Sequence, residues 1–138
     1  MGLKELVRYL ALVKLCNNVA ALKAFEMYFI DNRSPGEISR TLGIARYSVR
    51  GYIDRVIKNA GGFAKASMLV RVVVPHIASV KPVIETSNSI YRCRLCGLTF
   101  MSIRTAMPHV RDGHRDVFNQ TFESVITSVM RSLAKKAA

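Results

Sequence analysis

The sequence is poor in acidic residues and in cysteine, and it contains no long uncharged apolar run. Only 9 of its 138 residues are Asp or Glu, and they form no recognisable pair of catalytic carboxylates, so we expect no enzyme and no small-molecule substrate. No apolar run reaches the roughly 18 to 20 residues of a membrane span. Three cysteines provide no disulfide framework, which indicates a reducing compartment. Membrane proteins and disulfide-rich secreted scaffolds are thereby excluded.

The N-terminal segment is apolar but repeatedly interrupted by charge. Lys4, Glu5, Arg8 and Lys14 break up a stretch that might otherwise imitate a signal peptide. We therefore expect the protein to stay in the cytoplasm.

The charge balance is strongly basic. Lys and Arg number 21 against 9 acids, which gives a net charge of +12, and half of all residues are hydrophobic. The chain should therefore fold, as one ordinary domain with a small appendage. Such a balance favours a polyanionic partner, with nucleic acid ahead of a membrane surface.

One segment carries a complete set of metal ligands. Two cysteines separated by two residues precede two histidines separated by four, a pattern that can close around one zinc ion and leave no open position for chemistry. The site should be structural, and the remaining Cys16 should be a buried, inert thiol. The predicted ligands are Cys93, Cys96, His109 and His114.

This segment resembles the two-Cys, two-His zinc finger family over residues 89–116. Tyr91 and Phe100 match two core positions of the family, whereas Ala106 stands where the family usually carries Leu. The resemblance implies a β-hairpin followed by a helix, folded around one structural zinc. We do not expect this finger to contact DNA bases. The positions that contact bases in DNA-binding members of the family are occupied here by Ser102, Thr105 and Pro108, and Pro108 cannot form a side-chain hydrogen bond. We expect the finger to be an accessory module whose arginines meet phosphate or a protein partner, namely Arg92, Arg94, Arg104 and Arg111.

The first half of the chain has helical periodicity. Apolar residues at steps of three and four predict a helix over residues 3–16, and residues 20–30 predict a second, centrally packed helix. Ser34 and Glu37 form a capping box with Pro35 at the first helical position, and Gly43 ends that short helix. A further helix should begin near Ala45.

Residues 34–58 resemble the helix-turn-helix family of bacterial and archaeal regulators. The matching residues are Glu37-Ile38-Ser39, Leu42-Gly43-Ile44, Ser48-Val49 and Tyr52-Ile53, although the family usually has Ala at position 39 and Ser or Thr at position 45. The resemblance implies that helix 45–58 enters the DNA major groove; the alternative is two ordinary packed helices. The DNA-contacting residues would be Arg46, Tyr47, Ser48, Arg50, Arg55 and Lys58.

Residues 61–88 are interpreted as a change to β-structure. The β-branched stretch Ser67–Val74, stopped by Pro75, predicts a strand, and residues 80–85 predict a second one. Two strands after a helix-turn-helix are typical of a wing. Residues 87–89 are expected to be a linker. The predicted fold is mainly α with a small β-hairpin: a winged helix-turn-helix domain over residues 1–86, a ββα zinc finger over 89–116, and a C-terminal helix within 117–138.

The last helix is predicted over residues 116–135 with one apolar stripe. This stripe can pack on the N-terminal helices or form a homodimer seam, and we expect the dimer because two recognition helices would read a more selective site. Its members are Phe118, Phe122, Val125 and Val129.

Taken as a sequence, the chain is interpreted as a sequence-specific double-stranded DNA-binding protein, a transcription regulator. The combination of modules resembles small regulators of archaea and their viruses or plasmids. Two alternatives remain: an RNA-binding or ribosome-associated zinc protein, and a protein-interaction adaptor.

Overall fold

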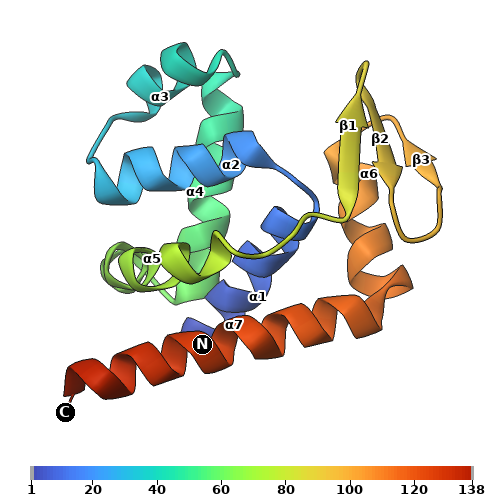
Figure 1. Cartoon of the computed structure of the whole chain (residues 1–138). Coiled ribbons are helices and arrows are strands. Elements are labelled where there is room, and N and C mark those ends of the chain that lie inside the picture. The colour runs from blue at the N-terminus through green and yellow to red at the C-terminus, as the bar shows by residue number, and fades with distance from the viewer. Residues whose placement is uncertain (1, 138) are drawn as a thin grey trace.

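The computed structural model describes residues 2–137 and is mainly helical, with a small antiparallel sheet at one side (Figure 1). In these residues no helix combines the length and the apolar character needed to cross a bilayer. The helical segments are α1 (Leu3–Leu15), α2 (Val19–Phe25), the π-helical η1 (Glu26–Ile30), α3 (Pro35–Leu42), α4 (Arg46–Ala60), α5 (Phe63–Ile77), α6 (Ile103–Pro108), the π-helical η2 (His109–Gly113) and α7 (Arg115–Ala137). The strands are β1 (Ile84–Ser87), β2 (Ile90–Cys93) and β3 (Thr99–Phe100), paired in the order β1-β2-β3.

Helix α1 lies at the centre of the molecule. It packs against α4, α5 and α7, so apolar residues on several sides of it are buried, whereas a surface helix buries a single stripe. Helix α2 covers one side of α4, and η1 packs on α5. The main core contains Leu6, Val7, Leu10, Phe25, Ile38, Val49, Ile53, Val56, Val70, Val73 and Val129.

The boundaries of α3 and α4 follow local chain chemistry, as expected from the sequence. The Ser34 hydroxyl accepts a hydrogen bond from the Glu37 amide at 3.2 Å, and Pro35 occupies the first turn, where its missing N–H has no helical partner. Gly43 ends α3 in the left-handed region with a φ of 68°. The Ser39 hydroxyl donates to the Ile44 carbonyl at 2.6 Å, so this serine braces the turn that leads into α4.

The segment predicted as the first strand of a wing is a helix. Residues Ser67–Val74 lie inside α5, and the buried positions Ala66, Val70, Val73 and Ile77 follow one another at steps of four, three and four. This helical spacing outweighs the β-branched composition, because burying a stripe against α1 stabilises the segment more than strand propensity does. Pro75 is tolerated in the last turns of the helix.

The second predicted strand also has a different role. Residues Ile84–Ser87 form β1, which pairs antiparallel with β2 in the register Ile84↔Cys93 and Ser87↔Ile90. The expected linker at 87–89 is the turn of this hairpin, since Asn88 and Ser89 both have positive φ, as a tight two-residue turn requires. The wing prediction was therefore wrong. The hairpin forms one sheet with β3 and belongs to residues 84–118, which contain the predicted metal ligands and are called the metal-ligand segment below.

Helix α7 runs beneath the other helices and packs on α1 and α5 (Figure 1). Phe122, Val125 and Val129 are at most 8% exposed, and the Arg8 guanidinium lies 5.1 Å from the centre of the Phe122 ring. The His76 Nδ1 and Ser128 Oγ atoms, 2.7 Å apart, link α5 to α7. The apolar stripe Phe118, Phe122, Val125 and Val129 is thus covered within one chain, and the homodimer stays a prediction.

Replacing Val129, which is fully buried in the main core, with Glu should lower the free energy of unfolding by about 3 kcal/mol, because burying an unpaired carboxylate is costly. The matched control is Met130→Glu on the same helix, where the side chain is 54% exposed and the change should be below about 0.5 kcal/mol. Urea unfolding followed by circular dichroism measures both. Equal stability of the two variants would contradict the packing of α7.

Candidate metal centre

The metal-ligand segment is joined to the rest of the molecule by a second apolar cluster. Leu12, Leu15 and Cys16 at the end of α1 pack with residues of the sheet, α6, η2 and the start of α7. The Val83 amide also donates to the Leu15 carbonyl at 2.8 Å. The segment is therefore docked on α1. Its own contributions to the cluster are Ile84, Cys93, Ala106, Val110 and Phe118.

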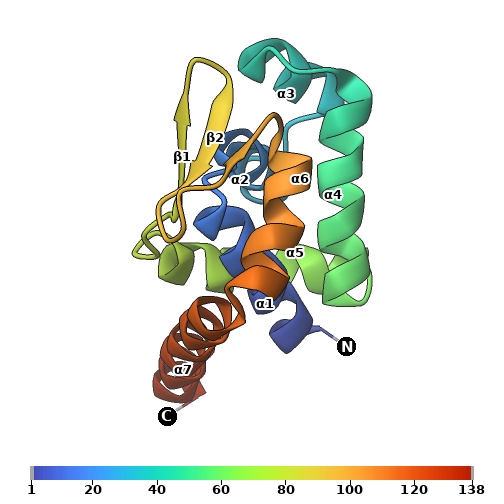
Figure 2. The ribbon, with the colours of Figure 1, turned by 90° about the vertical axis from the view of Figure 1, so that its right-hand side faces the viewer.

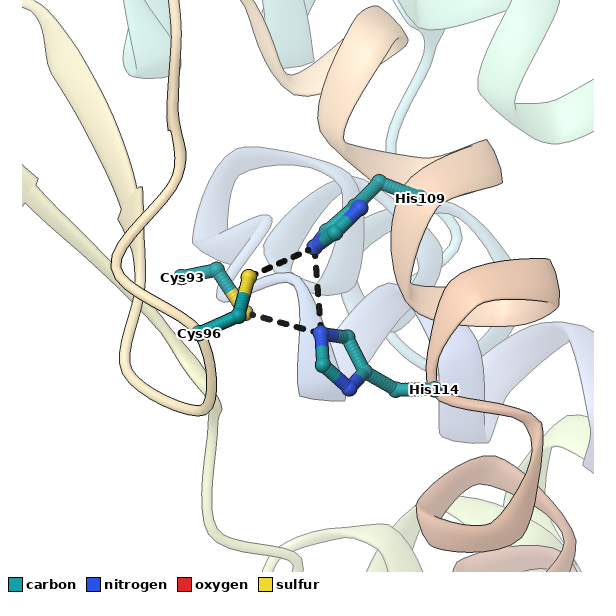
Figure 3. Close-up of side chains that lie close together, drawn as sticks. All are labelled: Cys93, Cys96, His109 and His114. Carbon is teal, nitrogen blue, oxygen red and sulfur yellow. Dashed lines mark hydrogen bonds between the residues drawn. The ribbon is translucent and has the colours of Figure 1, made fainter.

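Both cysteines lie on one tight turn after β2. The Gly97 amide donates to the Cys93 carbonyl, and the Cys93 amide donates to the Leu98 carbonyl, each at 2.8 Å. Gly97 has a φ of 82°, a left-handed conformation that a residue with a Cβ adopts at a cost. The turn points Cys93 and Cys96 toward α6 and η2 (Figure 3).

Both histidines lie where the helix changes pitch. Helix α6 begins after Ser102, whose hydroxyl accepts from the Thr105 amide at 3.3 Å, and it continues through Pro108 into η2. The wider π-helical turn brings residues five apart onto one side of the helix, and such turns recur at functional sites. His109 and His114 consequently face each other, with ring centres 4.7 Å apart.

A glycine makes room for this arrangement. A Cβ atom on Gly113 would lie 3.3 Å from Nδ1 of His109, which is tighter than ordinary van der Waals contact. The imidazole of His109 therefore lies directly over the backbone at Gly113. Its other side meets Phe100, whose ring centre is 4.9 Å away.

The four ligand atoms lie close enough together to surround one metal ion. The distances are 3.5 Å from Cys93 Sγ to His114 Nε2, 3.3 Å from Cys96 Sγ to His109 Nε2, and 3.1 Å between the two Nε2 atoms (Figure 3). Ordinary zinc–sulfur and zinc–nitrogen bond lengths imply edges of about 3.6 Å for S–N and about 3.3 Å for N–N. All four atoms lie within 4.8 Å of one another, so these side chains can hold one metal ion.

The surroundings of His109 favour the neutral form that binds metal. Burial, and then the neighbouring His114, lower the pKa of His109, which keeps its imidazole neutral and able to coordinate. Cys93 is fully buried, whereas Cys96 is exposed, so the centre lies at the edge of the apolar cluster. Burial raises the pKa of Cys16 to about 12, with a further contribution from Cys93, so Cys16 stays a thiol and is a poor ligand.

The core positions of the segment have the expected environments. Tyr91 and Phe100 are register partners on β2 and β3, and both are half-buried. Ala106, where the finger family usually carries Leu, is fully buried in the cluster that includes Leu12 and Leu15. Helix α1 thus fills space around position 106, which accounts for the small side chain.

The arginines expected as accessory contacts fall into two groups. Arg92 and Arg94 lie within 3.8 Å and 3.4 Å of the Glu85 carboxylate on β1. Arg111 hydrogen-bonds its neighbour Asp112, and Arg104 has no ion-pair partner in residues 2–137. All four side chains are exposed.

The residues expected to contact DNA lie on the outer side of α4, and most are exposed. Tyr47 is 81% exposed and Ser48 is half-buried. The Arg46 guanidinium lies across α3, 3.0 Å from where a Cβ of Gly36 would be. The structure brings three of these residues, Tyr47, Ser48 and Arg55, to a cleft shared with Arg104 and Arg111. The other polar lining residues, Tyr9, Asn18 and Tyr52, were not predicted from the sequence.

Replacing Cys96 with Ser should abolish stoichiometric metal binding and unfold residues 91–114, while the helices of the main core persist, since that core is built without this segment. Metal analysis of the purified chain and amide hydrogen exchange would measure the two effects. Cys16→Ala is the matched control and should retain one ion per chain. A tightly held ion in the Cys96→Ser variant would disprove the ligand assignment.

Comparison of the chain with family models, with curated proteins and with solved structures gave no match.

Proposed function

We propose that this chain binds duplex DNA in a sequence-specific manner through α3 and α4, used as a helix-turn-helix, and that it acts as a transcription regulator. The observation that carries the proposal is the division of α4 into two faces. Its apolar side is buried in the main core, whereas its outer side carries four exposed cations and a single acid, Asp54. The exposed cations are Arg46, Arg50, Arg55 and Lys58.

The dimensions of α4 suit this role. An α-helix with its side chains is about 10–12 Å wide, and the major groove of B-DNA is about 12 Å wide. Arg46 and Arg50 lie one turn apart near the start of α4, the end that usually contacts base edges in this motif. The net charge of +12 supplies the attraction to phosphate that accompanies base recognition.

We infer that the metal is zinc and that its role is structural. Two thiolates and two imidazoles are the ligand set that zinc takes in closed tetrahedral sites. Cys93, Cys96, His109 and His114 would hold it, with β2, β3 and α6 as a ββα finger. A closed site with four protein ligands supplies a cross-link and no Lewis-acid chemistry, so we propose no enzymatic step.

The RNA-binding alternative is favoured by one observation, the exposed ring of Tyr47. RNA modules stack bases on several rings, however. Tyr52 makes an edge contact with Phe25 at 6.5 Å and is half-buried, and Tyr91 and Phe100 are half-buried in the finger segment. We therefore prefer duplex DNA.

The adaptor alternative is favoured by a different observation. The finger segment exposes Leu95, Leu98 and Met101, by 45%, 56% and 83% respectively, near the cysteine turn. These side chains lie between Cys93 and Ala106 in the sequence and are outside the apolar cluster that docks the segment on α1. A protein partner there is compatible with DNA binding by α4.

Replacing both Arg46 and Arg50 with Ala should weaken binding to a duplex selected from random DNA by at least about 2 kcal/mol, roughly 30-fold, and should flatten the salt dependence. The loss is expected because base and phosphate contacts disappear together. Fluorescence anisotropy across a salt series would measure both. The control removes the same charge from the far end of α7, with Arg131→Ala and Lys135→Ala. Equal affinities of the two double variants at matched salt would contradict recognition by α4.

A further inference from the structure

Helices α4 and α6 form the two walls of a cleft of about 470 Å³. Figure 2 views the molecule from the side that carries both helices, and the lining of the cleft also includes Tyr9 and Leu12 of α1. The wall from α4 contributes Tyr47, Ser48, Gly51, Tyr52 and Arg55; the wall from α6 and η2 contributes Ile103, Arg104, Met107, Pro108 and Arg111.

The cleft is lined by cations and by no acid among the described residues. Burial raises the pKa of the Tyr9 phenol and the nearby Arg55 guanidinium opposes this, so Arg55 lies beside a neutral phenol that does not cancel its charge. Arg104 has no ion-pair partner in residues 2–137, and Arg111 shares its charge with the exposed Asp112. Three arginines that line one groove, with only Arg111 paired to an acid, favour an anionic occupant.

The spacing of these cations suits an extended polyanion better than a small anion. Arg104 and Arg111 are seven residues apart along α6 and η2, which corresponds to roughly 10 Å. One strand of B-DNA rises about 3.4 Å per nucleotide along the duplex axis and also winds around it, so neighbouring phosphates lie further apart than this rise and the length suits about two of them. Arg55 faces the same strand path from the opposite wall.

The position of α6 relative to α4 suggests which strand this is. If α4 occupies the major groove, a second helix of similar width cannot enter the same groove beside it. Helix α6 must then lie outside the groove, across the strand that borders it. We propose that the cleft between α4 and α6 seats one sugar–phosphate strand of the bound duplex, held by Arg55, Arg104 and Arg111. This inference rests on the proposed binding of duplex DNA by α4.

A single-stranded nucleic acid is the less favoured occupant of this cleft. Proteins that bind single strands combine a basic groove with several stacking rings. Of the two cleft tyrosines on α4, Tyr47 offers a free ring face, whereas Tyr52 is half-buried and its ring is held edge-on to Phe25. The cleft is thus equipped to hold a backbone and poorly equipped to stack successive bases.

The chain offers a matched control within the same segment. Arg92 and Arg94 are also exposed arginines of the finger segment, but they face Glu85 and do not line the cleft. Removing Arg92 and Arg94 takes away the same formal charge as removing Arg104 and Arg111. A difference between the two double variants therefore reports on position and not on net charge.

The test compares the full-length, metal-loaded wild type with Arg104→Ala/Arg111→Ala and with Arg92→Ala/Arg94→Ala on the selected duplex over a salt series. We expect the cleft variant to lose roughly 10-fold or more in affinity and to reduce the salt slope by about 2, one for each phosphate contact. The control variant should stay within about 3-fold of the wild type. Metal content and circular dichroism verify that both variants are folded.

A second measurement locates the strand directly. Duplexes in which single phosphates are replaced by neutral methylphosphonates should weaken wild-type binding at about three neighbouring positions of one strand. At the positions contacted by Arg104 and Arg111 the same replacements should cost the cleft variant nothing further, whereas the position contacted by Arg55 should stay sensitive in that variant.

The outcomes separate this inference from the proposed function. If Arg46→Ala/Arg50→Ala weakens duplex binding while the cleft variant matches the wild type, binding of a strand in the cleft is disproved and recognition by α4 stands. If the wild type binds no duplex but binds single-stranded oligonucleotides through Arg104 and Arg111, both proposals are overturned.

Discussion

The burial of α1 is the constraint on which the rest of this structure depends. One part of the helix is enclosed by α4, α5 and α7, and its end, at Leu12 and Leu15, is enclosed by the sheet, α6 and η2. A single rigid helix therefore belongs to both apolar clusters. Because each cluster orders the residues around it, α1 sets the distance between α4 in one cluster and α6 in the other. The cleft between those two helices is a consequence of that shared packing.

A metal ion at the candidate centre would also help to fix the position of α6 relative to α1. Small zinc modules depend on their ion because so short a segment buries too little apolar surface to offset its chain entropy. Here Ile84, Ala106 and Val110 also pack in one cluster with Leu12 and Leu15 of α1, so docking stabilises the segment and a bound metal ion would stabilise it further. An ion held by the four residues would tie the cysteine turn to η2, and docking ties that unit to α1. Together the two would give α6 one position.

The distribution of positive charge on the surface depends on which arginines form ion pairs with Asp or Glu. With 9 acids for 21 basic side chains, most cations must remain without a partner, and each local acid decides which side chains are partly neutralised. Glu85 on β1 faces Arg92 and Arg94, because the β1–β2 hairpin places Glu85 opposite Arg92. No acid lines the cleft in the described residues, so Arg55 and Arg104 keep their full charge there. Exposed ion pairs of this kind contribute little to stability, but they reduce the local positive potential.

The sequence by itself determined the features whose causes lie within a few residues. The cap at Ser34, the left-handed Gly43 and the spacing of Cys93, Cys96, His109 and His114 are local chemistry, and each was predictable from neighbouring residues. Tertiary structure decided what depends on distant partners. Residues Ser67–Val74 are helical because their stripe packs on α1, β1 is a strand because it pairs with β2, and the stripe of α7 is covered by α1 and α5. The cleft also required the fold, since Arg55 and Arg104 are far apart in the sequence and meet only because α1 joins the clusters that position them. Local signals specify conformation, whereas burial depends on which surfaces the chain brings together.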